Sequence, residues 1–412
     1  MTTTEAHGKT RTAADVIAAE SAHVLQVYRR NQVVLERGRG CRLFAADGRS
    51  FLDFLSGIGV AALGHGHPGL AAAIGAQALE LIHTSNLFFH PLQGQVATRL
   101  SDLSGLPRAF FCNSGAEAIE ACLKFARRYW RAQGAQDRTR FVALEHGFHG
   151  RTMGSLSVTW DDHYRAPFAP LVPEVTFVPN DDPAALAAAV GDKTAAIIAE
   201  PIQGEGGVRP LSARMAAAIN ETCGRTGTLL IADEVQCGLG RTGRPFHFSA
   251  LGLKPDLMSI GKALGAGVPI GAALFSERVA AAAAFGDHGS TYGGNLLACR
   301  AALVFLEELV DGGLMKHVEQ VGRHAEKQLR ALAAAHPEIR EVRGAGLMWG
   351  LDLDRPAAPV VEAALAKGLL INRTAETVIR LLPPYVISEA EIDEGVALLD
   401  AALTAATGKP QS

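Results

Sequence analysis

Three short apolar runs, each ending at a polar or charged residue, constrain the fold of this chain most strongly. They lie within residues 105–275, where short apolar runs alternate with longer helical patterns, a rhythm typical of βαβ units and a mainly parallel sheet. In chain order the runs are 195–199, 228–232 and 257–260, and the charged residues that follow them are Glu200, Asp233 and Lys262. Ligands of open α/β sheets bind beyond the carboxyl ends of the strands, so these three side chains predict one shared site.

The pattern changes beyond about residue 300, where a second and smaller domain is predicted. Helical spacing covers 316–335 and 357–368, a strand is predicted over 347–353, and an amphipathic helix is predicted over 388–405. The predicted organisation is an N-terminal segment that joins the small domain, a large domain and a C-terminal small α+β domain, with the bounds 1–60, 61–305 and 306–412.

Composition excludes several classes of protein. The 412 residues are enough for two or three domains, and a net charge of −3 provides no basic field for nucleic acid or an anionic membrane. No run of about 18 apolar residues predicts a membrane span, and residues 1–9 lack the apolar core of a signal peptide. None of the six cysteines forms a C-x-x-C pair, so we expect reduced thiols and a cytoplasmic protein.

A candidate phosphate site follows the strand predicted at residues 109–112. Ser114 and Glu117 have the spacing of a capping box, and apolar residues recur at helical spacing after them. The free N–H groups at a helix N-terminus bind anions such as phosphate, and Gly115 would allow a close approach. An ordinary capped helix after a strand has the same pattern, so this signal is weak by itself.

Lys262 is the strongest candidate for a reactive group. Small and apolar residues flank it on both sides, so we expect partial desolvation, which lowers the pKa of an amine and makes it nucleophilic. A Schiff base with pyridoxal phosphate (PLP) requires such an amine. Asp233 is suited to hold a proton on the pyridine nitrogen, which makes the ring an electron sink. An acidic pair after a strand is also compatible with a metal ligand or a helix cap.

These segments belong to an ordered series that resembles the class-III aminotransferases of fold type I. The motifs of the series occupy 52–58, 64–68, 113–118, 148–152, 200–207, 233–238, 259–267, 289–295 and 379–384. The resemblance covers nearly the whole chain from Tyr28 to the C-terminal helix. It implies an α/β, fold type I PLP-dependent transferase, with a large mainly parallel-sheet domain and a smaller α+β domain.

The resemblance also implies roles at the cofactor. Lys262 would form the Schiff base and move the proton, and Asp233 would pair with the pyridine nitrogen. The other cofactor residues would be Gly115 and Ala116 at the phosphate, Phe148 and Val235 on the two ring faces, Gln236 near the phenolic oxygen, and Thr291 at the phosphate of the neighbouring subunit. A site built from two chains implies a homodimer.

At the substrate, Arg151 resembles a carboxylate clamp, because a guanidinium binds a carboxylate through two parallel hydrogen bonds. Glu205 and Arg380 resemble a switch pair. Glu205 would neutralise Arg380 while the ω-amino donor is bound, and would release it for the α-carboxylate of glutamate. Ser290 and Tyr28 would lie near the substrate.

The activity implied is transfer of the ω-amino group of N-acetylornithine to 2-oxoglutarate, as in arginine biosynthesis. Ile58 lies where relatives that use ornithine carry a tyrosine for the free α-amino group, which favours an acylated donor. Ala62 departs from the asparagine common in the family, with no evident effect on substrate choice. The alternatives are 4-aminobutyrate, ornithine, succinyl-diaminopimelate or succinylornithine as donor and, less favoured, a PLP aminomutase or epimerase.

Two further alternatives are disfavoured. His65 with His67, and His146 with His149, have spacings that fit metal ligands, but no cysteine or carboxylate set accompanies them, so no metal is expected. A non-catalytic PLP-binding protein would be expected to lack Lys262 or Asp233, and both are present.

Overall fold

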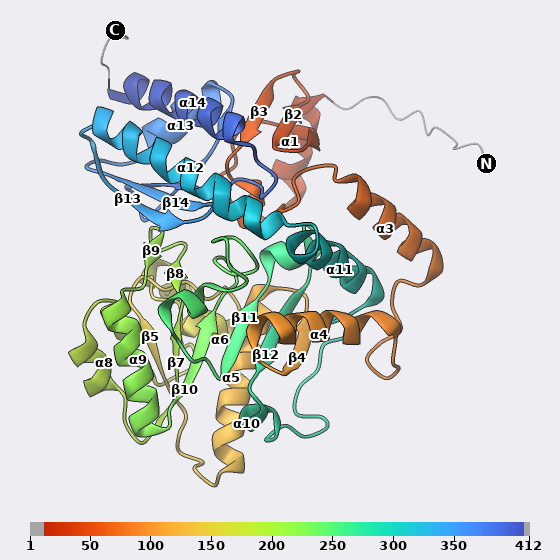
Figure 1. The fold of residues 1–412 in the computed structure, drawn as a ribbon, viewed down its shortest axis with the longest axis vertical. Helices are drawn as coiled ribbons and strands as arrows, with labels where there is room; N and C mark the ends of the chain where they lie inside the picture. The colour runs from red at the N-terminus through yellow and green to blue at the C-terminus, as the bar shows by residue number, and fades with distance from the viewer. Residues whose placement is uncertain (1–11, 408–412) are drawn as a thin grey trace.

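A seven-stranded sheet forms the centre of the larger part of the molecule (Figure 1). The computed structural model describes residues 12–407, so residues 1–9, which lack the apolar core of a signal peptide, lie outside the described residues. The strands in sheet order are β4 (Arg108–Cys112), β12 (Gly271–Phe275), β11 (Leu257–Ile260), β10 (Leu229–Asp233), β7 (Thr194–Ala199), β5 (Arg140–Leu144) and β6 (Val175–Val178). Only β12 runs antiparallel to its neighbours, which confirms the mainly parallel sheet.

Helices cover both faces of this sheet, and alternate residues of each strand face opposite layers. Ile198 and Ile231 pack in one cluster with helix α5 (Gly115–Ala132), whereas Ile197 and Leu230 pack in another with α8 (Pro183–Ala189) and α9 (Ala213–Thr226). All six residues of β7 are buried, as expected for a parallel strand covered on both faces. The three apolar runs form the central strands β7, β10 and β11. Each strand has apolar side chains on both faces of the sheet, and both faces are buried.

The remaining elements of the larger part surround this layered core. They are α2 (Ser56–Gly59), α3 (Pro68–Glu80), α4 (Pro91–Ser104), α6 (Met153–Ser157), α7 (Asp162–Arg165), the hairpin of β8 (Ile202–Gln203) and β9 (Arg209–Pro210), α10 (Glu277–Ala280), α11 (Leu296–Val310), and 3-10 turns at 166–168, 247–251 and 262–265. Among the described residues, no helix is long and apolar enough to cross a membrane.

The red N-terminal strands and the blue C-terminal elements lie side by side at one end of the large sheet (Figure 1). β3 pairs in parallel with β15, which joins the N-terminal strands to the C-terminal region. The elements are α1 (Ala13–His23), β1 (Leu35–Arg39), β2 (Arg42–Ala45), β3 (Ser50–Asp53), α12 (Leu314–Ala335), β13 (Ile339–Ala345), β14 (Met348–Leu353), α13 (Ala358–Ala366), β15 (Leu369–Leu370), β16 (Asn372–Thr374), β17 (Val378–Leu381) and α14 (Glu389–Thr407).

The predicted C-terminal helices and strand are present, with small differences at their ends. The helix predicted over 357–368 ends at Ala366, because Gly368 has a φ of +86° and turns the chain into β15. The bounds of the predicted domains stay predictions.

His336 bridges two carboxylates at the C-terminal end of α12. Its Nδ1 lies 3.0 Å from Glu338 Oε1 and its Nε2 lies 2.6 Å from Asp400 Oδ1 of α14. Burial of the ring lowers the pKa of His336, but the two carboxylates together raise it above its usual value. The protonated ring therefore ties α14 to the start of β13.

We expect His336→Gln to lower the melting temperature by about 3 °C at pH 6 and by less than about 1 °C at pH 9. A raised pKa in the folded state gives stability that is fully present below the unfolded pKa and is lost as pH rises through the folded pKa. Melting curves at both pH values and one protein concentration measure the difference. An equal loss at both pH values would mean that the ring acts through packing alone.

Candidate active site

The carboxyl ends of β7, β10 and β11 surround one pocket of about 250 Å³. The three charged residues predicted from the sequence, Glu200, Asp233 and Lys262, all line it. The other residues that line the pocket come from α5, the segment after β5 and the loops after β8 and β10, and they are Gly115, Ala116, Phe148, His149, Gly150, Arg151, Glu205, Val235 and Gln236. The parallel order of the strands brings these side chains together across long distances in sequence.

Lys262 begins the 3-10 turn directly after β11. Its φ of 42° is unusual for a residue with a side chain, and such strain is commonly found at functional sites. Burial lowers the pKa of Lys262, and Arg380 acts in the same direction, whereas Glu205 and Asp233 oppose the change. Its amine has no hydrogen-bond or ion-pair partner among the described residues. The sequence-based expectation of a desolvated lysine agrees with this environment.

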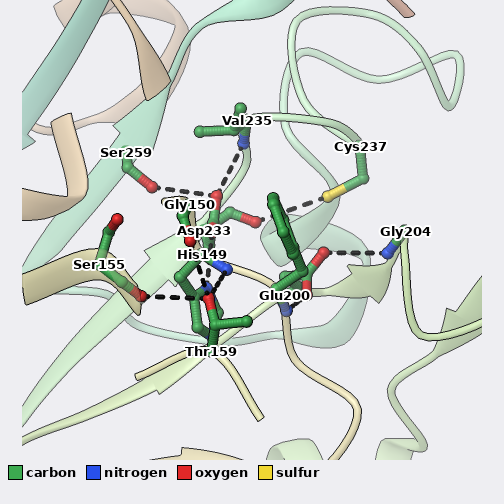
Figure 2. Close-up of polar contacts among 11 residues, drawn as sticks. His149, Gly150, Ser155, Thr159, Glu200, Gly204, Asp233, Val235, Cys237 and Ser259 are labelled. Carbon is green, nitrogen blue, oxygen red and sulfur yellow. Dashed lines mark hydrogen bonds and ion pairs between the residues drawn. The ribbon is translucent and has the colours of Figure 1, made fainter. Parts of the chain in front are cut away.

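Asp233 is held from three directions at the base of the pocket (Figure 2). Its Oδ2 lies 2.7 Å from Nδ1 of His149, and its Oδ1 accepts hydrogen bonds from the Val235 N–H and the Ser259 hydroxyl, both at 3.1 Å. Both Asp233 and His149 are buried. The carboxylate is thus fixed in one orientation before any ligand binds.

His149 is a site residue whose role could not be deduced from the sequence. It lies 84 positions from Asp233, and in the sequence it stands out only as the residue after Phe148 and as one of a histidine pair with the spacing of metal ligands. Its backbone N–H donates to the Thr159 hydroxyl at 2.9 Å, whereas its Nε2 is buried without a partner among the described residues. Among the described residues, Asp233 is therefore the hydrogen-bond partner of the His149 ring.

Glu200 connects the pocket to the loop that follows β8. Its two carboxylate oxygens accept the backbone N–H groups of Phe148 and Gly204, each at 2.9 Å (Figure 2). The pKa of Glu200 is raised to about 7, mainly by burial; His149 opposes this rise and Asp233 adds to it. Glu200 thus orients the backbone of two pocket segments.

Helix α5 points its N-terminus at the pocket, as predicted. The Ser114 hydroxyl accepts the Glu117 N–H at 3.2 Å, but the capping box is not reciprocal: Glu117 binds the N–H of Asn113, at 2.7 Å, instead of that of Ser114. A Cβ at Gly115 would lie 2.6 Å from Val235 Cγ1, so only glycine allows the helix start to pack this close to Val235.

Arg380 and Glu205 form a close ion pair beside the pocket. Nη1 of Arg380 donates to Glu205 Oε1 at 2.5 Å and to Gln236 Oε1 at 3.2 Å, although Glu205 and Arg380 are 175 positions apart. Arg380 is fully buried, whereas about 30% of the Glu205 side chain is exposed. Glu205 therefore lies between the guanidinium and the open part of the pocket.

A second pocket, of about 380 Å³, adjoins the first and shares Phe148 and Glu205 with it. The guanidinium of Arg151 lies over the ring of Tyr164, with Cζ 3.5 Å from the ring centroid, and Tyr164 lines the second pocket. Arg151 is exposed and forms no ion pair with another described residue. Its charge is therefore available to a ligand at the junction of the pockets.

Five predicted site residues do not line either pocket in this chain, and they are Tyr28, Ile58, Ser290, Thr291 and the buried Arg380. Tyr28 is 71% exposed, Ile58 is 39% exposed with a φ of 66°, and Thr291 is exposed. The Ser290 hydroxyl accepts a hydrogen bond from Asn113 Nδ2 at 3.2 Å, next to the start of α5. Their roles at the site stay predictions.

The histidine pairs considered as metal ligands have other contacts. His65 Nε2 lies 2.7 Å from Asp53 Oδ2, His67 accepts the Leu70 N–H as the cap of α3, and the His146 ring packs on Trp160. Within residues 12–407, no group of three or more His, Cys, Asp or Glu side chains is arranged to hold a metal ion.

Comparison with known proteins decides the family to which this site belongs. Residues 25–403 match the family model described as aminotransferase class-III. The chain is a class-III aminotransferase. The acetylornithine aminotransferase of Methanocaldococcus jannaschii is 44% identical over 388 residues, which are 94% of this chain and 98% of that protein.

Solved structures agree with the family and the fold. The ornithine aminotransferase of Toxoplasma gondii superimposes with a TM-score of 0.92 at 32% identity, covering 97% of each chain. A PLP-bound amine transaminase from an uncultivated Pseudomonas species has a TM-score of 0.86 at 32% identity, covering 93% of this chain and 97% of that one. The aminotransferase thus has the fold type I architecture of PLP-dependent transferases and uses PLP.

The pocket of the aminotransferase fits this cofactor. Lys262 offers an amine that no other described residue binds, Asp233 offers a fixed carboxylate, and the start of α5 offers backbone N–H groups for a phosphate. An aldehyde, a pyridine nitrogen and a phosphate are three of the groups by which PLP can be held. The donor set of the pocket therefore matches the cofactor group by group.

Proposed function

We propose that this aminotransferase moves the ω-amino group of N-acetylornithine to 2-oxoglutarate, giving N-acetylglutamate semialdehyde and glutamate. The observation that carries the proposal is the Arg380–Glu205 ion pair beside the exposed Arg151. Two substrates with different reacting ends need a cationic site that can be covered and uncovered. The 44% identity to an acetylornithine aminotransferase over nearly the whole chain supports the same donor.

The proposed cofactor residues line the pocket of about 250 Å³ that contains Lys262. Bound PLP supplies a ring that withdraws electrons from the carbon bearing the amino group. Asp233, fixed by His149 and Ser259, would hold the proton on the pyridine nitrogen. Lys262 Nζ would take the proton from the donor carbon, because burial lowers its pKa and favours the uncharged form that accepts a proton.

The remaining cofactor contacts are proposed on the positions of the side chains. Gly115 and Ala116 would bind the phosphate, Phe148 and Val235 would cover the two faces of the ring, and Gln236 would lie at its phenolic oxygen. All five line the same pocket as Lys262. A water-excluding enclosure of this kind strengthens each electrostatic contact inside it.

The substrate contacts separate the two half-reactions. Arg151 would bind the carboxylate of N-acetylornithine while Glu205 neutralises Arg380. With glutamate or 2-oxoglutarate, Glu205 would release Arg380 for the α-carboxylate. In the same proposal the aliphatic Ile58 offers no polar partner to a free α-amino group. This disfavours ornithine, whose α-amino group is charged, and suits a donor whose α-nitrogen is acylated.

A cytoplasmic homodimer belongs to the proposal. Thr291 is exposed next to a strongly apolar loop, in which Leu87 and Phe89 are 86% and 106% exposed. Asn86 of that loop binds the carbonyls of Ser290 and Gly293, so the loop and Thr291 lie on one surface. A second copy that covers this surface would bury the apolar side chains. Thr291 of one subunit would then lie at the cofactor site of the other subunit. All six cysteines are free, which supports a reducing compartment.

We expect the PLP form to lose its cofactor absorbance at least about tenfold faster in a single turnover with N-acetylornithine than with ornithine or 4-aminobutyrate at the same concentration. The expected preference reflects a site whose polar groups pair with the favoured donor and are left unpaired by the others. Stopped-flow absorbance measures the three rates.

Equal or faster conversion with ornithine or 4-aminobutyrate would overturn the proposed donor and leave the family and cofactor unchanged. Succinylornithine is the matched comparison for the acyl group, because it differs from the proposed donor only beyond the amide.

A further inference from the structure

The guanidinium of Arg380 is held at two of its three nitrogens. Nη1 binds Glu205 and Gln236, Nε donates to Asn372 Oδ1 at 3.2 Å, and Nη2 is buried without a partner among the described residues. Asn372 and Arg380 face each other as a pair in the β16–β17 hairpin. The arginine thus has one neutral partner from its own hairpin and one charged partner from a distant loop.

Glu205 is the charged side chain that has to move to uncover Arg380. Glu205 lines both pockets, so the second pocket, of about 380 Å³, offers space for its carboxylate. The Thr374 hydroxyl, two residues beyond Asn372, donates to the backbone carbonyl of Glu205 and fixes the main chain there. Hairpin β16–β17 therefore anchors both members of the ion pair.

The departure of Glu205 would leave the guanidinium without the one charged partner that it has in the described part of the chain. Gln236 contacts Nη1, which an incoming carboxylate also needs. Asn372 contacts Nε and so blocks the other edge of the guanidinium, leaving the Nη1–Nη2 edge open. Two parallel N–H groups on one edge are what a carboxylate binds best.

We propose that Asn372 is a positioning residue that keeps Arg380 oriented for the α-carboxylate of glutamate and 2-oxoglutarate. The inference rests on the proposed function, because it requires that Glu205 leaves Arg380 in one half-reaction. Asn372 is suited to this task because its amide accepts the Nε–H without neutralising the positive charge. An aspartate at this place would form a permanent ion pair and compete with the substrate.

The test compares the two half-reactions in Asn372→Ala and Asn372→Asp. Asn372→Ala is expected to raise the glutamate concentration for half-maximal rate about tenfold and to change conversion by N-acetylornithine by less than about twofold. Asn372→Asp is expected to raise the value for glutamate about tenfold further. The Kd of glutarate, a dicarboxylate that cannot react, should shift by the same factors in calorimetry.

Thr377→Ala is the control for general loosening of the hairpin. Thr377 binds Asp352 Oδ1 at 2.8 Å from the same hairpin and does not contact Arg380, so glutarate binding should stay within about twofold of the wild type. Equal losses with both donors in Asn372→Ala, or unchanged glutarate binding, would overturn the inference. If the wild-type PLP form reacts with glutamate but not with N-acetylornithine, the proposed donor is wrong. The comparison of wild type and Asn372 variants with glutamate would still decide the role of Asn372.

Discussion

Lys262→Ala is expected to lower kcat by about 10⁴-fold or more and to remove the visible absorbance of the bound cofactor. Two functions of one amine would be lost together, namely the covalent hold on PLP and the proton transfer at the donor carbon. Steady-state turnover and the absorbance spectrum of the PLP-treated variant measure the two losses. Retention of more than about a hundredth of the wild-type kcat would contradict the assignment.

Protein stability provides an independent check on Lys262. Its amine has no partner within residues 12–407, and burial lowers its pKa, so its charged form is unfavourable in the folded state. The cofactor-free variant should therefore melt no lower than the cofactor-free wild type. Lys254→Ala is the matched control, since Lys254 is an exposed lysine shortly before β11 and its loss should leave turnover within about twofold.

Asp233→Asn is expected to lower kcat by about 10³-fold, the second largest effect. The amide has nearly the shape of the carboxylate but lacks the charge that would keep the pyridine nitrogen protonated. The hydrogen bonds from Val235 and Ser259 can persist in the variant, so the pocket should keep its shape. Single-turnover rates with N-acetylornithine measure the loss. A kcat above about a tenth of the wild-type value would contradict the proposed role of Asp233 at the pyridine nitrogen.

Asp256→Asn separates chemistry from stability. Asp256 lies before the opposite end of β11, where it accepts the Leu230 N–H at 3.1 Å and binds Arg278 at 2.7 Å. This variant should unfold more easily but keep kcat within about threefold of the wild type. A loss of kcat equal to that of Asp233→Asn would mean that the larger effect comes from a damaged sheet.

Much of the fold and part of the site could be predicted because their signals are local. A strand buried on both faces needs an uninterrupted apolar run, and the runs before Glu200 and Asp233 have that form. The start of α5 carries its signal in Ser114 and Glu117, within one turn of the helix. The order of parallel strands then places the residues after them at one edge. The family resemblance, spread over nearly the whole chain, paired Glu205 with Arg380, and these residues do form an ion pair that no local pattern predicts.

The sequence by itself determined the strands, the first turn of α5, and the position of Lys262 and Asp233 at the strand ends. Only the tertiary structure decided which side chains hold them. His149 reaches Asp233 across 84 positions, and Asn372 reaches Arg380 through the register of one hairpin. Periodicity describes the neighbours of a residue along its own element, whereas a hydrogen bond between elements depends on strand order, register and loop conformation. The residues that orient the site therefore became visible only in three dimensions.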